Sequence, residues 1–358
     1  MIESFHAFSP YELPQAEKEL LLLKELTELT SRHYQNCRPY HDMLDGMGVD
    51  ISRLSSVEQI PFFPVRMFKE MDLLSIPRDK VFKTTTSSGT TGQVVSRVYA
   101  DMETAMIQQR VLIRIFSDFI GKKRLPMLVI DARETVRNRQ MFTARGGAII
   151  GLQMIASKQI FALDKDMNLQ TDVVREFLRE YAGQKFLIFG FTFMVWQHFY
   201  QELMKMEERF DLSRAFLMTS GGWKKLESQK ISREEFKARF QELCGITHFM
   251  DHYGMAEQIG AINAECEYGH LHTSIYSDII PRRHEDFSPC DIGEVGILQM
   301  VSVLPHSYPG HSLISEDQGV ILGVDDCPCG RKGKYFKVLG RIKQAELRGC
   351  SDTYAAKF

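Results

Sequence analysis

The sequence predicts an α/β protein in which helices cover a parallel sheet and a smaller antiparallel part follows. In the middle of the chain, short apolar runs alternate with amphipathic segments, as is typical of strand–helix–strand units. From Gly293 onward, apolar runs separated by proline and glycine turns replace the helical spacing. With 358 residues, 44% of them hydrophobic, the chain can bury a large core as one large domain or two unequal ones.

The first part of the chain is expected to be mainly helical. Leucines recur at helical spacing among lysines and glutamates, which predicts a helix over residues 14–44. A rigid apolar connector at 61–64 leads into a short helix over 65–73. Residues 84–92 hold seven hydroxyl side chains and two glycines between β-prone flanks, which predicts a strand, a loop and a second strand. Another helix is expected over 102–119.

The alternating section supplies the strands and helices of the parallel sheet. Apolar runs predict strands at residues 127–130, 148–150, 186–190, 216–219 and 247–250. Amphipathic segments predict helices over residues 171–181, 191–209 and 232–243. Antiparallel strands are then expected at 294–303 and 320–322, with turns at Pro305 and Pro309-Gly310.

The composition excludes several classes of partner. The net charge is −2 and the two signs are interspersed, so we expect neither nucleic-acid binding nor attachment to a membrane surface. The N-terminus lacks a signal-peptide pattern, and no apolar run approaches membrane-spanning length. An odd number of scattered cysteines favours reduced thiols in the cytoplasm over a disulfide framework. The cysteines are Cys37, Cys244, Cys266, Cys290, Cys327, Cys329 and Cys350.

The hydroxyl-rich loop is the first candidate binding site. Its amides and short hydroxyls are groups that can wrap an anion, and its glycines permit the close backbone approach that this requires. No lysine follows Gly92, so the loop is not a Walker phosphate loop, and a polar hairpin turn is the alternative interpretation. The candidate phosphate-binding residues are Ser87, Ser88, Gly89, Thr90, Thr91 and Gly92.

Two further motifs come directly after predicted strands, where ligands gather in open α/β sheets. Residues 251–257 read Asp-His-Tyr-Gly-Met-Ala-Glu, and Glu257 is a candidate Mg²⁺ ligand because hard cations take carboxylate oxygens. A glutamate in a first helical turn equally favours the helix dipole alone. Gly221 and Gly222 would let a flat ligand lie against the backbone, although a simple left-handed turn explains them as well.

Together these motifs resemble the adenylate-forming superfamily of acyl-CoA synthetases. The resemblance is carried in order by Ser-Ser-Gly-Thr-Thr-Gly, Gly-Gly, Tyr-Gly-Met-Ala-Glu, Glu316-Asp317 and Gly340-Arg341, and it covers most of the chain. Within the superfamily the sequence is most similar to the acyl-protein synthetase family (LuxE-type, long-chain-fatty-acid–luciferin-component ligases), which is related to phenylacetate–CoA ligases. Gly-Gly-Trp-Lys at 221–224, residues 252–257 and a cysteine just before the C-terminus carry this closer match.

The resemblance implies a fold and a set of nucleotide contacts. The fold is the adenylate-forming N-terminal-type core, with helix-covered mixed sheets and a small antiparallel part. Residues 87–92 would hold the β- and γ-phosphates of ATP. Gly221 and Gly222 would border the adenine, and Tyr253, followed by Gly254, would stack near it.

The resemblance also implies the residues around the metal and the ribose. Glu257 would bind Mg²⁺, and Asp317 would accept hydrogen bonds from both ribose hydroxyls. Arg341 would contact ribose or phosphate. Two departures affect the comparison: Gln93 to Arg97 replace the Gly-x-Pro-Lys continuation of many relatives, and Ile342-Lys343-Gln344 replace an acidic hinge.

The sequence after Arg341 suggests the acyl acceptor. Full-length acyl-CoA synthetases continue for roughly 100 residues or more, a domain-sized lid with a catalytic lysine, whereas 17 residues follow Arg341 here. We therefore expect no lid domain. Resemblance to the acyl-protein synthetases implies that Cys350 accepts the acyl group as a thioester, and the alternative is an inert thiol in the chain's last residues.

Four residues form a candidate Zn²⁺ site: Cys266, His272, Cys327 and Cys329. Three sulfurs and one nitrogen suit tetrahedral Zn²⁺, and His270 competes with His272 for the nitrogen position. Phenylacetate–CoA ligase relatives show a similar pattern, which implies a structural site. Two unrelated pairs of reduced cysteines are the alternative.

The resemblance implies an ATP-dependent acyl-protein synthetase that activates a fatty or aryl carboxylic acid and passes it to a partner such as an acyl reductase. An acyl- or aryl-CoA ligase of the phenylacetate type and a non-catalytic nucleotide-binding protein remain as alternatives. The acyl wall would include Phe189, Phe191, Phe193, Met194 and Trp196, which a plain core also explains. We expect three parts: a helical segment 1–75, a catalytic core 76–340 and a tail 341–358.

Overall fold

The computed structural model describes residues 2–86, 95–136 and 144–342. These residues form two compact units. The first comprises the described residues of Met1–Arg114, Gly254–Asn263 and His270–Phe358, and the second comprises those of Ile115–Tyr253 and Ala264–Gly269. The division expected from the sequence, at residues 75 and 340, stays a prediction.

Two consecutive α-helices begin the first unit, where the sequence predicted one. Its α-helices are α1 (Gln15–Asn36), α2 (Arg38–Met47), α3 (Met67–Glu70) and the first part of α4 (Met102–Ile120). The single helix predicted over 14–44 is therefore wrong: Cys37 is extended, at φ −124° and ψ 101°. Pro39 has no N–H to donate, and its ring would clash with the carbonyl of the preceding turn, so α2 starts anew around it.

The sheet of the first unit is antiparallel, as expected for the last part of the chain. Its strands run in the order β12 (Ser277–Arg282), β13 (Val295–Ser302), β14 (Ser312–Val324), β15 (Lys334–Arg341) and β11 (Leu271–His272). The short β1 (Phe63–Pro64) pairs with β14 in parallel. The predicted strands at 294–303 and 320–322 are confirmed, although β14 extends much further toward the N-terminus.

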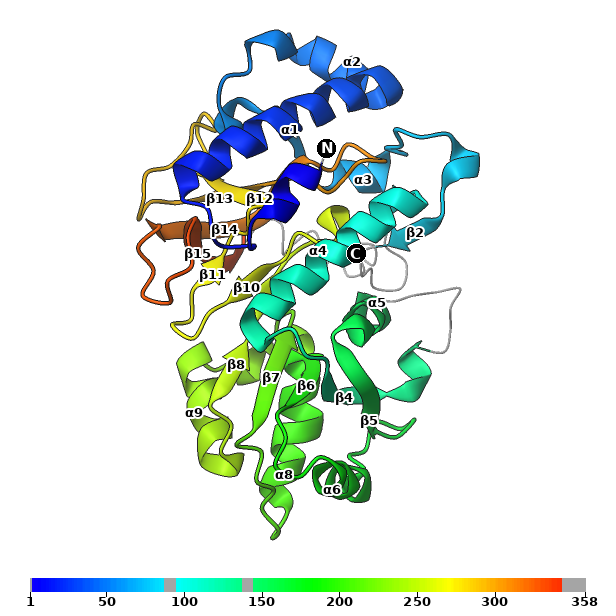
Figure 1. Ribbon diagram of the computed structural model, residues 1–358, viewed down its shortest axis with the longest axis vertical. Coiled ribbons are helices and arrows are strands. Elements are labelled where there is room, and N and C mark those ends of the chain that lie inside the picture. Colours follow the sequence, from blue (N-terminus) through cyan, green and yellow to red (C-terminus); the bar gives the residue numbers. More distant parts are fainter. Residues whose placement is uncertain (1, 87–94, 137–143, 343–358) are drawn as a thin grey trace, which may run out of the picture. The chain divides into compact units, whose positions relative to one another are not determined.

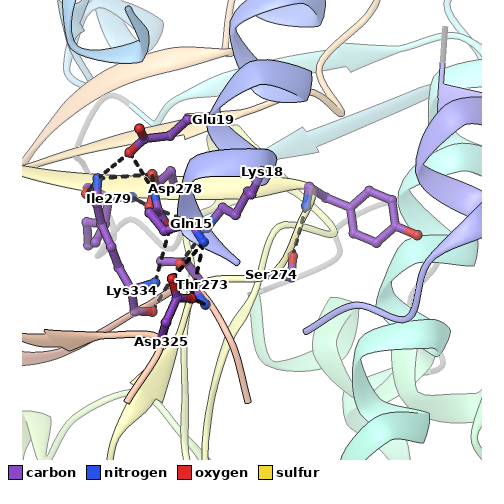
Figure 2. Close-up of polar contacts among 11 residues, drawn as sticks. Gln15, Lys18, Glu19, Thr273, Ser274, Asp278, Ile279, Asp325 and Lys334 are labelled. Carbon is purple, nitrogen blue, oxygen red and sulfur yellow. Dashed lines mark hydrogen bonds and ion pairs between the residues drawn. The ribbon is translucent and has the colours of Figure 1, made fainter. Parts of the chain in front are cut away.

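Buried charges fasten α1 to this sheet (Figure 2). Lys18 lies 3.5 Å from the Asp278 carboxylate of β12 and donates to the Thr273 hydroxyl over 2.7 Å. Lys334 of β15 lies 3.0 Å from the other oxygen of Asp278. Burial lowers the pKa of Lys18 to about 8, against the opposing charge of Asp278. The two ammonium groups share one carboxylate, which compensates charges that would be costly to bury alone.

The segment around the hydroxyl-rich loop also belongs to the first unit. Strands β2 (Lys83–Thr86) and β3 (Arg97–Ala100) pair antiparallel, with Thr86 opposite Arg97. This pairing confirms the two strands predicted to flank the loop. Residues 87–94 between them lie outside the described part of the chain.

The second unit contains the predicted parallel sheet (Figure 1). Its strand order is β5 (Ala156–Leu163), β4 (Leu125–Ala132), β6 (Phe186–Phe191), β7 (Ala215–Ser220) and β8 (His248–Met250). Every neighbouring pair is parallel. The sides of β4 and β6 are buried almost throughout, as expected when both faces of a parallel sheet are covered.

The remaining elements of the second unit are helices and two short strands. They are the end of α4, α5 (Ala144–Gly151), α6 (Thr171–Glu180), α7 (Thr192–Met194), α8 (Gln201–Lys205), α9 (Arg233–Cys244) and β9 (His252–Tyr253). The short β10 (Asn263–Glu265) spans the boundary in sequence between the units. None of the described helices is long and apolar enough to span a membrane.

Two sequence predictions in this unit are corrected. The strand predicted at 148–150 is wrong, because these residues end α5 and the strand follows at β5. Three apolar residues carry no period, so a short run cannot separate strand from helix. The helix predicted over 191–209 ends at Lys205 and contains a π-helical turn over Val195–Tyr200. The helices predicted near 171–181 and 232–243 are confirmed, and the Ser232 side chain caps α9 by accepting from the Glu235 amide.

Candidate active site

The candidate residues are distributed over both units. The first unit contains Gly254, Glu257, His272, Asp317, Cys327, Cys329 and Arg341. The second unit contains Gly221, Gly222, Tyr253 and Cys266. The predicted phosphate-binding residues 87–92 and the candidate acyl acceptor Cys350 lie outside the described residues.

Glu257 is a buried acid in the first unit. Its side chain lies in the turn η9 (Ala256–Gln258) and is only 5% exposed. Burial raises the pKa of the Glu257 carboxyl, although the Ser96 hydroxyl donates to it and the charges of Lys69 and Arg341 oppose the shift. Ser96 stands two residues after the undescribed hydroxyl-rich segment. The carboxylate therefore lies close to the strand that leaves the predicted phosphate loop.

Close packing holds the Glu257 turn in place. The Gln258 side-chain amide donates to the carbonyls of Met300 and Gly310, over 2.9 and 2.8 Å. A side chain at Gly310 would stand 2.6 Å from the Glu257 carbonyl oxygen, so only glycine fits there without displacing the turn. These contacts present the Glu257 carboxylate from a fixed backbone.

Asp317 and Arg341 face each other across neighbouring strands. Asp317 of β14 pairs in register with Arg341 at the end of β15. The Arg341 Nε atom lies 3.9 Å from an Asp317 carboxylate oxygen, and both side chains are partly exposed. The first unit thus brings together Glu257, Arg341 and Asp317, which are separated in sequence by up to 84 positions (341 − 257).

The paired glycines follow β7 in the second unit. Gly221 has φ +69°, in the left-handed region that side chains rarely adopt. A Cβ atom there would also meet the Phe191 ring at 3.1 Å, whereas nothing lies within 4 Å of the same position on Gly222. The Thr192 hydroxyl donates to the Gly221 carbonyl over 2.6 Å. The left-handed turn and the exposed backbone of Gly222 are thus both present at the carboxyl end of a parallel strand.

Tyr253 stands two residues after Asp251, which belongs to a partly buried charged cluster of the second unit. Asp251 precedes β9, and burial raises the pKa of its carboxyl to about 6 while the charge of Arg233 opposes the shift. The Asp251 amide donates to the Glu265 carboxylate over 2.8 Å. Arg233 and Lys237 of α9 donate to the same carboxylate over 2.7 and 2.8 Å.

Thiols and imidazoles gather at the end of the first unit's sheet. Ligand atoms of His272, Cys327 and Cys329 lie within 4.8 Å of one another. The His270 Nδ1 atom also lies 3.2 Å from the Cys327 sulfur. Cys266 is buried in the segment 264–269, which belongs to the second unit, and precedes His272 by six residues.

The residues of the predicted acyl wall are mostly buried. Phe189, Phe191, Met194 and Trp196 are all less than 9% exposed. Trp196 stacks on Tyr200 at 4.5 Å between ring centroids. Both interpretations of this cluster, an acyl wall and a plain core, therefore stay open.

Three residues of these arrangements were not singled out from the sequence. Ser96 contacts Glu257, and Arg233 and Glu265 order the segment before Tyr253. Each is a common polar residue with no motif around it, and only the adjacency of Glu265 to Cys266 offered a signal.

Sequence relatives of the chain are acyl-protein synthetases and ligases. The family described as "Acyl-protein synthetase, LuxE" matches residues 4–358. A long-chain-fatty-acid–luciferin-component ligase from Vibrio harveyi is 22% identical, covering 94% of this chain and 90% of the relative. The enzyme of the same name from Aliivibrio fischeri is 20% identical, covering 96% of this chain and 90% of the relative.

Solved structures confirm the fold expected from the motifs. A 2-hydroxyisobutyryl-CoA ligase with 2-HIB-AMP and CoA aligns with a TM-score of 0.73 and 16% identity, covering 94% of this chain and 77% of the other. At this identity the likeness is evidence of the fold alone, and it confirms the adenylate-forming core. With the family match, the expectation of a ligase that activates an acid with ATP is confirmed as well. The chain belongs to the acyl-protein synthetase family.

Proposed function

We propose that this protein adenylates a long-chain or aryl carboxylic acid with ATP and transfers the acyl group to Cys350. The observation that carries the proposal is the grouping of Glu257, Arg341 and Asp317 in the first unit, with Ser96 linking Glu257 to the strand after the hydroxyl-rich loop. The grouping supplies a carboxylate that could bind a metal ion, a cation, and a carboxylate that could accept hydrogen bonds from ribose. These are the roles that the sequence motifs predicted for the three residues.

In the first step, a carboxylate oxygen of the acid attacks the α-phosphorus of ATP. The bond to the oxygen that bridges the α- and β-phosphorus atoms breaks, which gives acyl-AMP and pyrophosphate. Backbone amides and hydroxyls of residues 87–92 would hold the departing phosphates, because preformed donors stabilise developing charge without reorganisation. Asp317 would accept hydrogen bonds from the ribose hydroxyls, and Arg341 would contact the ribose or neutralise the charge of a nearby phosphate.

Glu257 is the residue proposed to hold Mg²⁺. Its carboxylate oxygens are the hard ligands that Mg²⁺ prefers, and hydrogen bonds of the neighbouring Gln258 side chain hold the turn that carries it. When bound, Mg²⁺ would supply charge neutralisation to the phosphates. The residues proposed to contact the adenosine part of ATP are Gly221, Gly222, Tyr253 and Gly254.

In the second step, the Cys350 thiolate attacks the acyl carbonyl of acyl-AMP. A carbon–sulfur bond forms and AMP leaves, so the acyl group becomes a thioester on the enzyme. Handover to an acyl-accepting protein would follow, and an acyl reductase is the kind of partner that consumes an activated acid. The names of the two bacterial ligase relatives favour a long-chain fatty acid over an aryl acid.

We also propose a structural Zn²⁺ at Cys266, His272, Cys327 and Cys329. In the first unit, one imidazole and two thiols of the types that bind Zn²⁺ have their ligand atoms within 4.8 Å of one another. Cys266 is the proposed fourth ligand, since only five residues lie between it and His272 in the sequence. A soft sulfur-rich donor set suits Zn²⁺ and disfavours Mg²⁺.

Labelling tests both steps. We would incubate the protein with ATP, Mg²⁺ and a panel of radiolabelled fatty and aryl acids, then separate it on a denaturing gel. We expect hydroxylamine-labile label on wild-type protein and on Cys290→Ala, the matched control, but none on Cys350→Ala.

Other outcomes favour the alternatives. Soluble acyl-CoA that forms only with added CoA, without label on the protein, would identify a CoA ligase. Absence of ATP–pyrophosphate exchange with every acid would contradict adenylation itself and leave a non-catalytic nucleotide-binding protein.

A further inference from the structure

Glu265 is the buried centre of the partly buried charged cluster in the second unit. Its side chain is 4% exposed and forms ion pairs with Arg233 and Lys237 over 2.7 and 2.8 Å. The carboxylate accepts hydrogen bonds from three groups: Arg233, Lys237 and the Asp251 amide. A buried charge with this many donors fixes the position of each of them.

The groups that donate to Glu265 are connected, through hydrogen bonds or the chain itself, to the two segments that carry candidate adenosine contacts. The first segment follows β7: Arg233 also donates to the Thr219 hydroxyl over 3.2 Å, and Thr219 stands two residues before Gly221. The second follows β8: Asp251 exchanges hydrogen bonds with Glu265, since the Glu265 amide donates back to the Asp251 carbonyl over 2.8 Å. Asp251 stands two residues before Tyr253.

Two further contacts hold the backbone of the residues that surround Glu265. The Asp251 carboxylate accepts from the amide of His252 over 2.8 Å. Arg233 is the first residue of α9, and the Ser232 cap fixes the start of that helix. Arg233 therefore reaches Thr219 and Glu265 from a well-defined backbone position, and Glu265 completes the connection to β9.

We propose that Glu265 is a positioning residue for nucleotide binding, which holds the segments after β7 and β8 in the arrangement that accepts adenosine. The proposal rests on the proposed function of Gly221, Gly222 and Tyr253. Glu265 itself touches no nucleotide. Its loss should weaken ATP binding while leaving the chemical step intact once ATP is saturating, because the residues assigned to phosphate and metal belong to other segments.

The test is Glu265→Gln, with ATP–pyrophosphate exchange and calorimetric binding of a non-hydrolysable ATP analogue as readouts. We expect KM for ATP and Kd for the analogue to rise about tenfold or more, with kcat within about threefold of wild type. Glu242→Gln, an exposed glutamate on α9, is the matched control and should leave both constants unchanged. Zinc content is measured in parallel, because Cys266 follows Glu265 directly.

A mutant cycle tests the connectivity. Arg233→Gln should raise KM as Glu265→Gln does, and the double variant should be no worse than either alone, since both break one network. Thr219→Val and Lys237→Met each remove a single donor or acceptor and should raise KM by about twofold to fivefold. These milder variants carry the test if Glu265→Gln fails to fold.

Several results would overturn the proposal. A folded Glu265→Gln protein with wild-type KM and Kd would do so, as would a fall in kcat without a change in KM. Loss of zinc that accounts for the whole effect, so that zinc reloading restores KM, would assign Glu265 to the metal segment instead. Failure of the proposed function is separate: it would appear as absent exchange in wild-type protein.

Discussion

At the scale of single residues, the neighbouring atoms distinguish positions that look alike in the sequence. Gly221 and Gly222 form one motif, but only Gly221 has positive φ and a ring within 3.1 Å of a Cβ position. Glu257 and Glu265 are both buried acids, but burial raises the pKa of Glu257 whereas two cations lower that of Glu265. The neighbours, not the residue type, decide each property.

Gly221→Ala should destabilise the protein and weaken ATP binding. The left-handed conformation costs a residue with a Cβ atom about 1–2 kcal/mol, and the Phe191 ring must also shift. We expect the free energy of unfolding in urea to fall by about that amount and KM for ATP to rise. Gly222→Ala is the matched control, because nothing lies within 4 Å of its Cβ position; equal effects of the two variants would contradict this account.

The buried His311 should make the protein sensitive to acid. Burial lowers the pKa of His311 to about 3, whereas an unfolded histidine titrates near 6.5. Between these values the unfolded state binds the extra proton, so stability is fully present above about pH 6.5 and falls as the pH drops toward 3. His33, stacked on His311 at 5.0 Å, has a lowered pKa for the same reason and adds to the effect.

His311→Gln measures this contribution. The slope of unfolding free energy against pH between pH 6 and 5 should decrease by about one proton, or about 1.4 kcal/mol per pH unit. Glutamine retains polar atoms toward Thr30 and Tyr40, which lie 3.0 and 3.3 Å from the His311 Nε2 atom. His284→Gln, at an exposed position, should leave the slope unchanged. A His311→Gln slope equal to that of wild type would show that His311 does not titrate in this range.

At the scale of elements, long-range polar contacts decide where α1 packs. The apolar face of α1 is readable from its leucines, but its partner strands are not. Lys18 contacts Asp278 of β12 and Thr273, the residue after β11, and both lie more than 250 residues away in the sequence (Figure 2). The Gln15 side chain adds a 2.6 Å hydrogen bond to the same aspartate.

Lys18→Met should loosen α1 without changing the sheet. Removing one member of a buried ion pair typically costs about 3–5 kcal/mol, and Lys334 compensates part of that by remaining 3.0 Å from Asp278. We therefore expect a loss of about 1–3 kcal/mol in urea unfolding. Lys24→Met, an exposed lysine on α1, should change stability by no more than about 0.5 kcal/mol. If Lys18→Met left the free energy of unfolding unchanged, the attraction between Lys18 and Asp278 would only balance the cost of burying their charges.

At the scale of the whole molecule, the chain matches its family over nearly its full length. The first unit holds most strands of a largely antiparallel sheet, and the second holds a parallel sheet. A metal ion that binds the folded chain at the proposed zinc site should stabilise that folded state by mass action.

Chelation tests this expectation. Protein purified without chelator should contain about one equivalent of zinc. A strong chelator should lower the unfolding temperature by several degrees, and added Zn²⁺ should restore it. Cys329→Ser should lose both the metal and the chelator effect, whereas Cys244→Ser, which lies outside the cluster, should keep them. Well under one equivalent of zinc in freshly purified protein would contradict the site.

The sequence by itself determined the fold class, the family and most strands of the parallel sheet. Those features follow from local pattern: apolar runs between amphipathic segments, and motifs whose order is preserved along the chain. The tertiary structure alone decided the break at Cys37, the helical state of 148–150, and the partners of Glu257, Lys18 and Glu265. Each of these depends on atoms distant in sequence, because a buried charge or a strained turn is stable only with neighbours that folding brings to it.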